Sequence, residues 1–124
     1  MTDTKIIVLD DEPIVCERLK PALEKKGFYV ETYTQSKDVI DRITQQKFDV
    51  LVTDLKMRKP DGLDVMDYVS QYSPSTKVII ITGFATVETA TKAMKSGAVD
   101  FIAKPFRISQ LRDLIVKITS EDDD

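Results

Sequence analysis

The sequence predicts an α/β fold, a five-stranded parallel sheet of order 2-1-3-4-5 flanked by five helices. Three observations support this class. Short β-branched runs alternate five times with segments whose apolar residues recur at helical spacing. The runs are mostly continuous rather than alternating, which is typical of parallel strands buried on both faces. Strict strand–helix alternation also implies right-handed crossovers and a ligand crevice between the first and third strands.

The first strand and helix have clear boundaries. A β-branched run at residues 6–9 stops at three acidic residues and predicts a buried strand followed by a loop. Pro13 suits the first turn of the next helix, and Gly27 is a good helix stop. Pro21 lies inside this helix, where it removes a hydrogen bond and is expected to kink the chain.

The second and third strands are predicted at residues 28–33 and 48–53. Ser36 is expected to cap the helix between them, which carries three apolar residues on one face. The third strand stops at Asp54. Residues 55–62 are rich in charged residues and contain proline and glycine, so they are expected to form a loop.

The second half of the chain repeats the pattern. A short third helix is expected before Pro74, and residues 77–82 form the clearest strand. A fourth helix should close at Gly97, followed by a fifth strand at 99–103 and a fifth amphipathic helix at 108–118. This arrangement matches the flavodoxin-like strand order.

The length bounds the domain organisation. A chain of 124 residues is expected to form one domain, residues 1–124, with a core at about 5–118 and an acidic tail at 120–124. The formal net charge of −3 gives no basic footprint, so direct nucleic-acid binding by this domain is not expected.

Composition excludes several chemistries. Histidine is absent, so no mechanism that needs an imidazole of this chain can operate. A single cysteine excludes an internal disulfide and a cysteine-based zinc site. No apolar run approaches the roughly 20 residues that span a bilayer. The N-terminus lacks a signal-peptide pattern, so a cytoplasmic location and no membrane contact are expected.

Chemically useful side chains follow four of the predicted strands. Asp10 and Asp11 follow the first strand, Asp54 follows the third, Thr82 ends the fourth and Lys104 follows the fifth. In an open parallel sheet, the site lies beyond the carboxyl ends of the strands. Because the first and third strands are predicted neighbours, the three carboxylates should converge.

Three converging carboxylates repel one another unless a cation lies among them. Hard oxygen ligands with open positions favour Mg²⁺, which keeps waters and accepts a phosphoryl oxygen. A carboxylate is also a competent nucleophile toward phosphorus. Lys104 can neutralise charge on the phosphoryl group, and Thr82 can hydrogen-bond one of its oxygens. These parts predict in-line phosphoryl transfer to the protein itself.

Five motifs in order give the sequence a family resemblance. They are VLDDE at 8–12, VTD at 52–54 with DG at 61–62, IITG at 80–83, GAVDF at 97–101, and KPF at 104–106. Each is weak alone, but together at these spacings they are highly specific. The chain resembles a response-regulator receiver domain of two-component signalling over about residues 5–118.

The resemblance implies a role for each matching position. Asp54 would be the phosphoacceptor, and Asp11 and Asp54 would bind Mg²⁺ together with the backbone carbonyl of Lys56. Asp10 would act mainly through a metal-bound water. Lys104 would pair with the phosphoryl group, and the peptide bond between Lys104 and the following proline is expected to be cis.

The resemblance also implies partners and an output. A histidine kinase or a histidine phosphotransfer protein would donate the phosphoryl group. Thr82 and Phe101 match the family's switch pair, which biases a surface formed by the fourth helix, fifth strand and fifth helix. A homodimer through that surface is an expected assembly. The domain would act on itself rather than as an enzyme on a free substrate, and its sequence looks most like receivers of AAA+ transcriptional activators.

The sequence departs from the family pattern after the phosphoacceptor. The family often has proline where this chain has Arg58, and Pro60 comes two residues later. Lys56 and Phe84 occupy two variable positions that tune loss of the phosphoryl group. Neither suits orienting a water, so slow self-dephosphorylation is a hypothesis, which predicts that replacing Phe84 by Glu or Asn accelerates the loss.

Three other functions fit parts of the sequence. A flavin or dinucleotide carrier would share the fold but would need a glycine- or hydroxyl-rich loop after the first strand, where this chain is acidic. A phosphatase with an aspartyl intermediate would carry a second Asp where this chain has Lys56. An interaction module independent of phosphorylation usually lacks one of the Asp, Thr or Lys positions, and all are present here.

Overall fold

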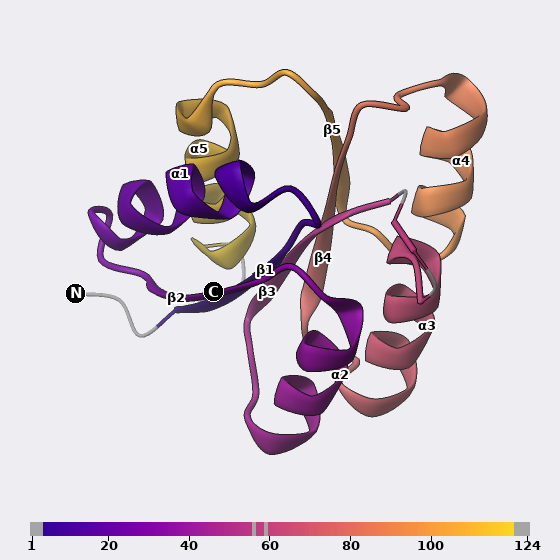
Figure 1. Cartoon of the computed structure of the whole chain (residues 1–124), viewed down its shortest axis with the longest axis horizontal. Coiled ribbons are helices and arrows are strands. Elements are labelled where there is room, and N and C mark those ends of the chain that lie inside the picture. Colours follow the sequence, from indigo (N-terminus) through magenta and orange to yellow (C-terminus); the bar gives the residue numbers. More distant parts are fainter. Residues whose placement is uncertain (1–3, 56, 59, 121–124) are drawn as a thin grey trace.

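The computed structural model describes residues 4–55, 57–58 and 60–120. Five strands and five helices alternate along it, as predicted (Figure 1). The strands are β1 (Lys5–Leu9), β2 (Tyr29–Tyr33), β3 (Val50–Asp54), β4 (Lys77–Thr82) and β5 (Asp100–Ala103). The helices are α1 (Pro13–Glu24), α2 (Ser36–Gln45), α3 (Gly62–Tyr72), α4 (Val87–Lys95) and α5 (Ile108–Ser120).

The strands form one parallel sheet of order β2-β1-β3-β4-β5, which confirms the predicted topology. Three strands begin slightly later than predicted. The amide of Phe28 donates to the carbonyl of Leu23, so Phe28 belongs to the turn after α1 rather than to β2. Phe48 is a buried core residue that precedes β3, and β5 starts one residue after Val99.

Helices cover both faces of the sheet (Figure 1). Helices α1 and α5 pack on one face, where Leu19 and Leu111 are almost fully buried against the strands. Helices α2, α3 and α4 cover the other face, with Val39 and Val65 fully buried there. The central strands lie between these two apolar layers, so their continuous β-branched runs are explained by burial on both sides.

The two expected helix stops are confirmed, and one expected helix cap is wrong. Helix α1 contains Pro21 and continues to Glu24, and Gly27 and Gly97 adopt positive φ values of 98° and 110° in the turns after α1 and α4. The expected cap at Ser36 is wrong, because Ser36 is the first residue of α2 and its hydroxyl donates to the carbonyl of Pro60 at 2.6 Å.

The α4–β5 edge buries few of its residues. Helix α4 has one buried residue, Ala93, and β5 has one, Ile102. Val87 and Met94 of α4 are 86% and 46% exposed. By contrast, every residue of β3 is buried.

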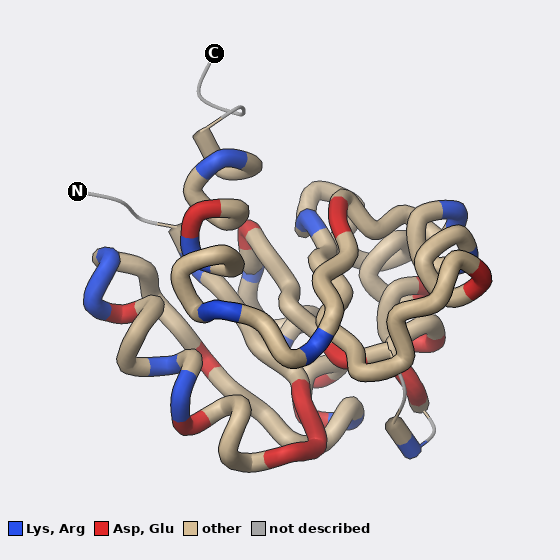
Figure 2. The backbone as a smooth tube through the Cα atoms, turned by 90° about the horizontal axis from the view of Figure 1, so that it is seen from above, with Lys and Arg blue, Asp and Glu red and all other residues tan. Residues whose placement is uncertain are grey.

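Charges are distributed over the surface. In Figure 2 acidic and basic positions are interspersed along the helices. Within the described part of the chain, no helix is long and apolar enough to cross a membrane.

Candidate functional site

The site forms where β1 and β3 lie side by side. Leu9 is in register with Thr53, so the residues that follow them, Asp10 and Asp54, reach the same edge of the sheet. Asp10 is fully buried and Asp54 is 6% exposed. The predicted convergence of these two carboxylates is therefore confirmed.

Lys104, which follows β5, lies between these two carboxylates and contacts both. Its Nζ lies 2.7 Å from Asp10 Oδ2, 2.8 Å from Asp54 Oδ2 and 3.0 Å from Glu12 Oε1. The peptide bond from Lys104 to Pro105 is cis, as the resemblance implied. The backbone amide of Lys104 donates to the carbonyl of Thr82 at 2.8 Å, which ties its position to the end of β4.

Burial and charge act in opposite directions at this cluster. Burial raises the pKa of Asp10, and hydrogen bonds from Lys104 and from the Glu12 amide offset part of that rise. Burial also disfavours the charged Lys104 ammonium, but its hydrogen bonds to Asp10, Asp54 and Glu12 raise the Lys104 pKa overall. Lys104 therefore stays charged and holds the carboxylates together.

The same carboxylates suit a divalent cation. One oxygen from each of Asp10, Glu12 and Asp54 lies within 4.8 Å of the others. Within the described residues, the ion pair with the Lys104 ammonium is the polar contact of the buried Asp10 Oδ2 atom. Such oxygens are hard ligands of the kind that Mg²⁺ prefers, so the residues present fit this ion.

Glu12 is the member of the cluster that the sequence analysis missed. Its backbone amide donates to Asp10 Oδ1 at 2.9 Å, and this tight turn directs its side chain back toward Lys104. The signal was an acidic residue two positions after Asp10, which alone indicates only a solvated loop.

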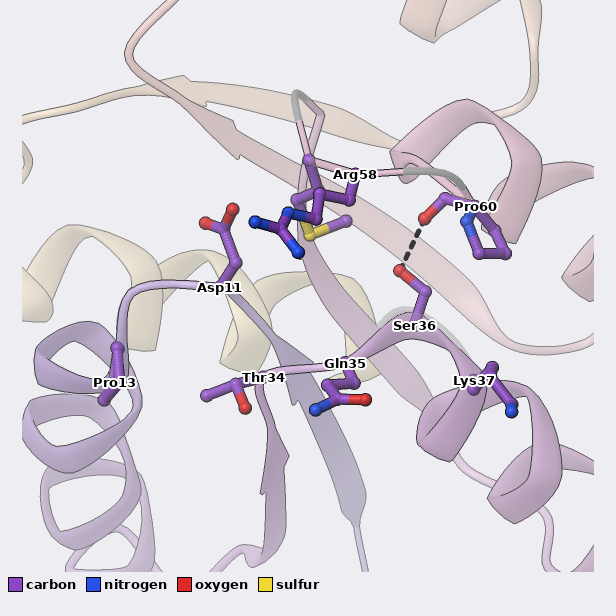
Figure 3. A pocket seen from close by; sticks show the side chains of 9 residues that line it. Asp11, Pro13, Thr34, Gln35, Ser36, Lys37, Arg58 and Pro60 are labelled. Atoms are coloured by element: carbon purple, nitrogen blue, oxygen red, sulfur yellow. Dashed lines mark hydrogen bonds between the residues drawn. The ribbon is translucent and has the colours of Figure 1, made fainter.

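The structure leaves the expected metal-binding roles of Asp11 and Lys56 as predictions. Asp11 is exposed and lines a neighbouring pocket together with Arg58, rather than joining the group of Asp10, Glu12 and Asp54 (Figure 3). Lys56, whose backbone carbonyl was expected to complete the metal site, lies outside the described residues.

The expected switch pair lies beside the cluster. Thr82 is fully buried at the end of β4, and its hydroxyl oxygen accepts a hydrogen bond from the Phe84 amide at 3.1 Å. Phe101 is partly buried and packs against the layer formed by α2, α3 and α4. Thr82 thus lies at the end of β4 beside Lys104, and Phe101 lies in the α4–β5 edge.

The loop after Asp54 is held at several points. Gly62 donates its amide to the Leu55 carbonyl at 3.1 Å, and Asp61 and Asp64 form a reciprocal capping box at the start of α3. A Cβ added at Gly62 would lie 2.3 Å from the backbone oxygen of Asp54, so the close approach requires glycine. The bond from Ser36 to Pro60 links this loop to α2.

The response regulator receiver domain model matches residues 6–116 of the chain. The chain belongs to this receiver domain family. Receiver domains are the phosphorylation-activated switches of response regulators.

Named relatives agree with the receiver assignment. The response regulator protein PilR of Pseudomonas aeruginosa is 32% identical over 115 residues, which are 93% of this chain and 26% of PilR. The alginate biosynthesis transcriptional regulatory protein AlgB of the same species is 33% identical over 87% of this chain and 24% of AlgB. The chain thus spans about a quarter of the length of these curated relatives, which are named as regulators.

Solved structures share the receiver fold. A receiver domain from Clostridium thermocellum has a TM-score of 0.89 and 32% identity, with 97% of each chain covered. The beryllofluoride-activated NtrC4 receiver domain dimer has a TM-score of 0.86 and 34% identity, with 95% of this chain and 97% of that one covered.

Proposed function

We propose that this receiver domain accepts a phosphoryl group on Asp54 from a histidine kinase or a histidine phosphotransfer protein in the cytoplasm. The observation that carries the proposal is the Lys104 ammonium, which lies within 2.8 Å of both Asp10 and Asp54. A nucleophilic carboxylate beside a fixed cation, at the carboxyl edge of a parallel sheet, is suited to phosphoryl transfer.

The transfer forms one bond and breaks one. An Asp54 carboxylate oxygen attacks the phosphorus of the donor phosphohistidine, and the P–N bond breaks with its electron pair going to the imidazole nitrogen. Lys104 neutralises charge on the phosphoryl oxygens, and the Thr82 hydroxyl hydrogen-bonds one of them. The product is an aspartyl phosphate on Asp54, and loss of the phosphoryl group to water resets the domain. The domain catalyses only these reactions of its own.

The acidic residues would also hold Mg²⁺. Asp10, Asp11, Asp54 and the backbone carbonyl of Lys56 are the proposed ligands, with Asp10 acting through a water. When bound, Mg²⁺ supplies positive charge to the phosphoryl oxygens. Glu12 adds a further carboxylate beside these ligands.

The proposed output runs from Thr82 through Phe101 to the α4–β5–α5 surface. Thr82 lies at the end of β4 and Phe101 packs under α4, so both can respond to charge at Asp54. The NtrC4 receiver, which shares 34% identity, is a dimer in its beryllofluoride-activated form. That likeness supports phosphorylation-dependent homodimerisation here.

Intact-protein mass spectrometry after incubation with acetyl phosphate tests the proposal. The wild type, Asp54→Ala and a matched control, Asp67→Ala, are compared with and without Mg²⁺. Asp67 is an exposed aspartate on α3, away from the site. The wild type and the control should gain one phosphoryl group only with Mg²⁺, and Asp54→Ala should gain none.

Two results would contradict the proposal. Phosphorylation that persists in Asp54→Ala would place the acceptor elsewhere. If the wild type gains no phosphoryl group from acetyl phosphate or from a panel of phosphorylated histidine phosphotransfer proteins, the domain works as an interaction module without phosphorylation.

A further inference from the structure

A pocket beside the acidic cluster places a basic side chain opposite a proposed metal ligand. The pocket has a volume of about 550 Å³ and lies between the loops that follow β1, β2 and β3. Asp11 and Arg58 both line it, and Figure 3 shows the Asp11 carboxylate and the Arg58 guanidinium pointing toward each other. Arg58 thus faces Asp11, one of the proposed ligands of a divalent cation.

The side chains of Asp11 and Arg58 are not fixed by ion pairs or hydrogen bonds among the described residues. In the described part of the chain, no salt bridge or hydrogen bond engages the side chain of Asp11 or of Arg58. Both are exposed, so either can reorient in solvent. The Asp11 carboxylate can therefore turn toward a bound cation or toward the guanidinium, but a close approach of both cations to one carboxylate is electrostatically unfavourable.

The loop that carries Arg58 makes a hydrogen bond to α2 near the pocket. Two residues further on, the carbonyl of Pro60 accepts the 2.6 Å hydrogen bond from the Ser36 hydroxyl. Ser36 is buried at the start of α2. This bond ties Pro60 to α2 beside the pocket that Arg58 also lines.

The formal charges show what Arg58 changes. Among the described residues, the carboxylates of Asp10, Glu12 and Asp54 face one ammonium, that of Lys104, whereas Asp11 lies outside this group. Arg58 adds a second positive charge at the side of Asp11. A positive charge near a divalent site weakens cation binding, and the effect is screened by salt when the charge is exposed.

We propose that Arg58 competes with Mg²⁺ for Asp11 and lowers the affinity of the receiver site for the ion. The inference rests on the proposed function, because it concerns the same metal site. It makes Arg58 a tuning residue that sets how much free Mg²⁺ the domain needs before it can be phosphorylated. A side chain without charge at this position, such as the proline that is common in the family, cannot act in this way.

Lys37 provides an internal control for general electrostatics. It lines the same pocket and carries the same charge, but Figure 3 shows its side chain pointing away from Asp11. If only net charge mattered, removal of either cation would have a similar effect. If competition for Asp11 matters, only Arg58 should affect Mg²⁺ binding strongly.

Isothermal titration with MgCl₂ on the unphosphorylated chain tests the inference without any reaction. The variants are Arg58→Gln, Arg58→Lys and Lys37→Gln, each at low and at high KCl. Arg58→Gln should lower the Mg²⁺ Kd by about threefold at low salt, and the difference should shrink at high salt. Arg58→Lys should stay near the wild type, and Lys37→Gln should change the Kd by less than half as much. Mg²⁺-dependent shifts in Tm provide a second readout of the same order of affinities.

The outcomes separate this inference from the proposed function. An unchanged Kd in Arg58→Gln, or equal changes in Arg58→Gln and Lys37→Gln, would overturn the competition while leaving phosphorylation of Asp54 intact. Absence of Mg²⁺ binding in every variant would overturn the competition and the metal site together. Loss of phosphorylation, measured separately by mass, would concern the proposed function alone.

Discussion

The centre of the sheet, formed by β1 and β3, differs from the α4–β5 edge in how much of its side-chain surface is buried. Both regions belong to the same repeating pattern of strands and helices. Ile6, Ile7, Val8 and Leu9 of β1 are all fully buried, as is most of β3. At the α4–β5 edge one residue of each element is buried. The acidic cluster lies over the tightly packed centre, and the proposed output surface lies over the loosely packed edge. The difference suggests that packing fixes the site and leaves the output free to change.

The largest expected effect is a cavity in the centre. Leu51 of β3 is fully buried between the helices and the sheet. Leu51→Ala should lower the free energy of unfolding by about 3 kcal/mol, because the rigid surroundings cannot collapse onto the space left. Urea unfolding measures this. A loss below about 1 kcal/mol would mean that the centre is not the rigid half of the molecule.

A methyl group at Gly62 tests the close approach under the site. An added Cβ would lie 2.3 Å from the Asp54 oxygen and 2.8 Å from the Leu55 Cα, so the backbone after Asp54 must shift. Gly62→Ala should lower the free energy of unfolding by about 2 kcal/mol and slow phosphorylation by acetyl phosphate.

Gly83 is the matched control for that substitution. A Cβ at Gly83 meets nothing within 4 Å, and Gly83 is not among the described residues with positive φ. Gly83→Ala should therefore change stability by no more than about 0.5 kcal/mol. Equal losses in the two variants would point to a general effect of glycine substitution rather than to the contact with Asp54.

The opposite edge of the sheet is held by a polar cluster and gives a pH-dependent test. Glu31 of β2 accepts hydrogen bonds from Arg42 at 2.6 and 2.7 Å and from Tyr33 at 2.6 Å. Arg42, together with the tyrosine hydroxyls, lowers the pKa of Glu31 to about 2. The ionised carboxylate thus stabilises the fold above its unfolded pKa of about 4.5, and this contribution disappears as the pH falls toward 2.

Glu31→Gln should therefore lower the free energy of unfolding by about 1 kcal/mol at pH 7. The effect is modest because the ion pair of Glu31 with Arg42 is partly exposed to solvent. The difference from the wild type should shrink as the pH falls from about 4.5 toward 2. Chemical unfolding of both proteins across that pH range provides the measurement. A difference that does not depend on pH would show that Glu31 acts through packing and not through its charge.

The smallest expected effect is at the α4–β5 edge. Val87 is 86% exposed at the start of α4. Val87→Ala should change the free energy of unfolding by less than about 0.5 kcal/mol. If α4 supplies the output surface, the same variant should weaken phosphorylation-dependent self-association, measured by sedimentation. A stability loss comparable to that of Leu51→Ala would remove the contrast between the two regions.

Sequence reasoning succeeded where strand ends define position. Asp10, Asp54 and Lys104 lie at or just after the carboxyl ends of strands in one parallel sheet, so the parallel topology predicts that they meet. It failed where a side chain is placed by a turn. Glu12 reaches Lys104 because of the turn around Asp10, and Ser36 bonds to a carbonyl 24 residues away rather than to its own helix. Such contacts depend on loop paths that local patterns do not specify.

The position of Asp11 shows the same limit at the site itself. Its place after β1 predicts that it lies near Asp54. That place does not predict whether its carboxylate joins the group of Asp10, Glu12 and Asp54 or lines the neighbouring pocket. Asp10 is buried and Asp11 is exposed at the bend after β1, so these adjacent carboxylates enter different surroundings.

The contact between Lys104 and Glu12 joins residues 92 positions apart in sequence. During synthesis the ribosome releases the acidic loop early and the lysine that neutralises it late, after all five strands. A nascent chain that has assembled β1, β2 and β3 therefore carries the carboxylates without their internal ammonium. The ion pairs of Lys104 with Asp10, Glu12 and Asp54 form only once the residue after β5 has been added, so a polypeptide halted before β5 lacks the ammonium of the proposed phosphoryl-transfer site.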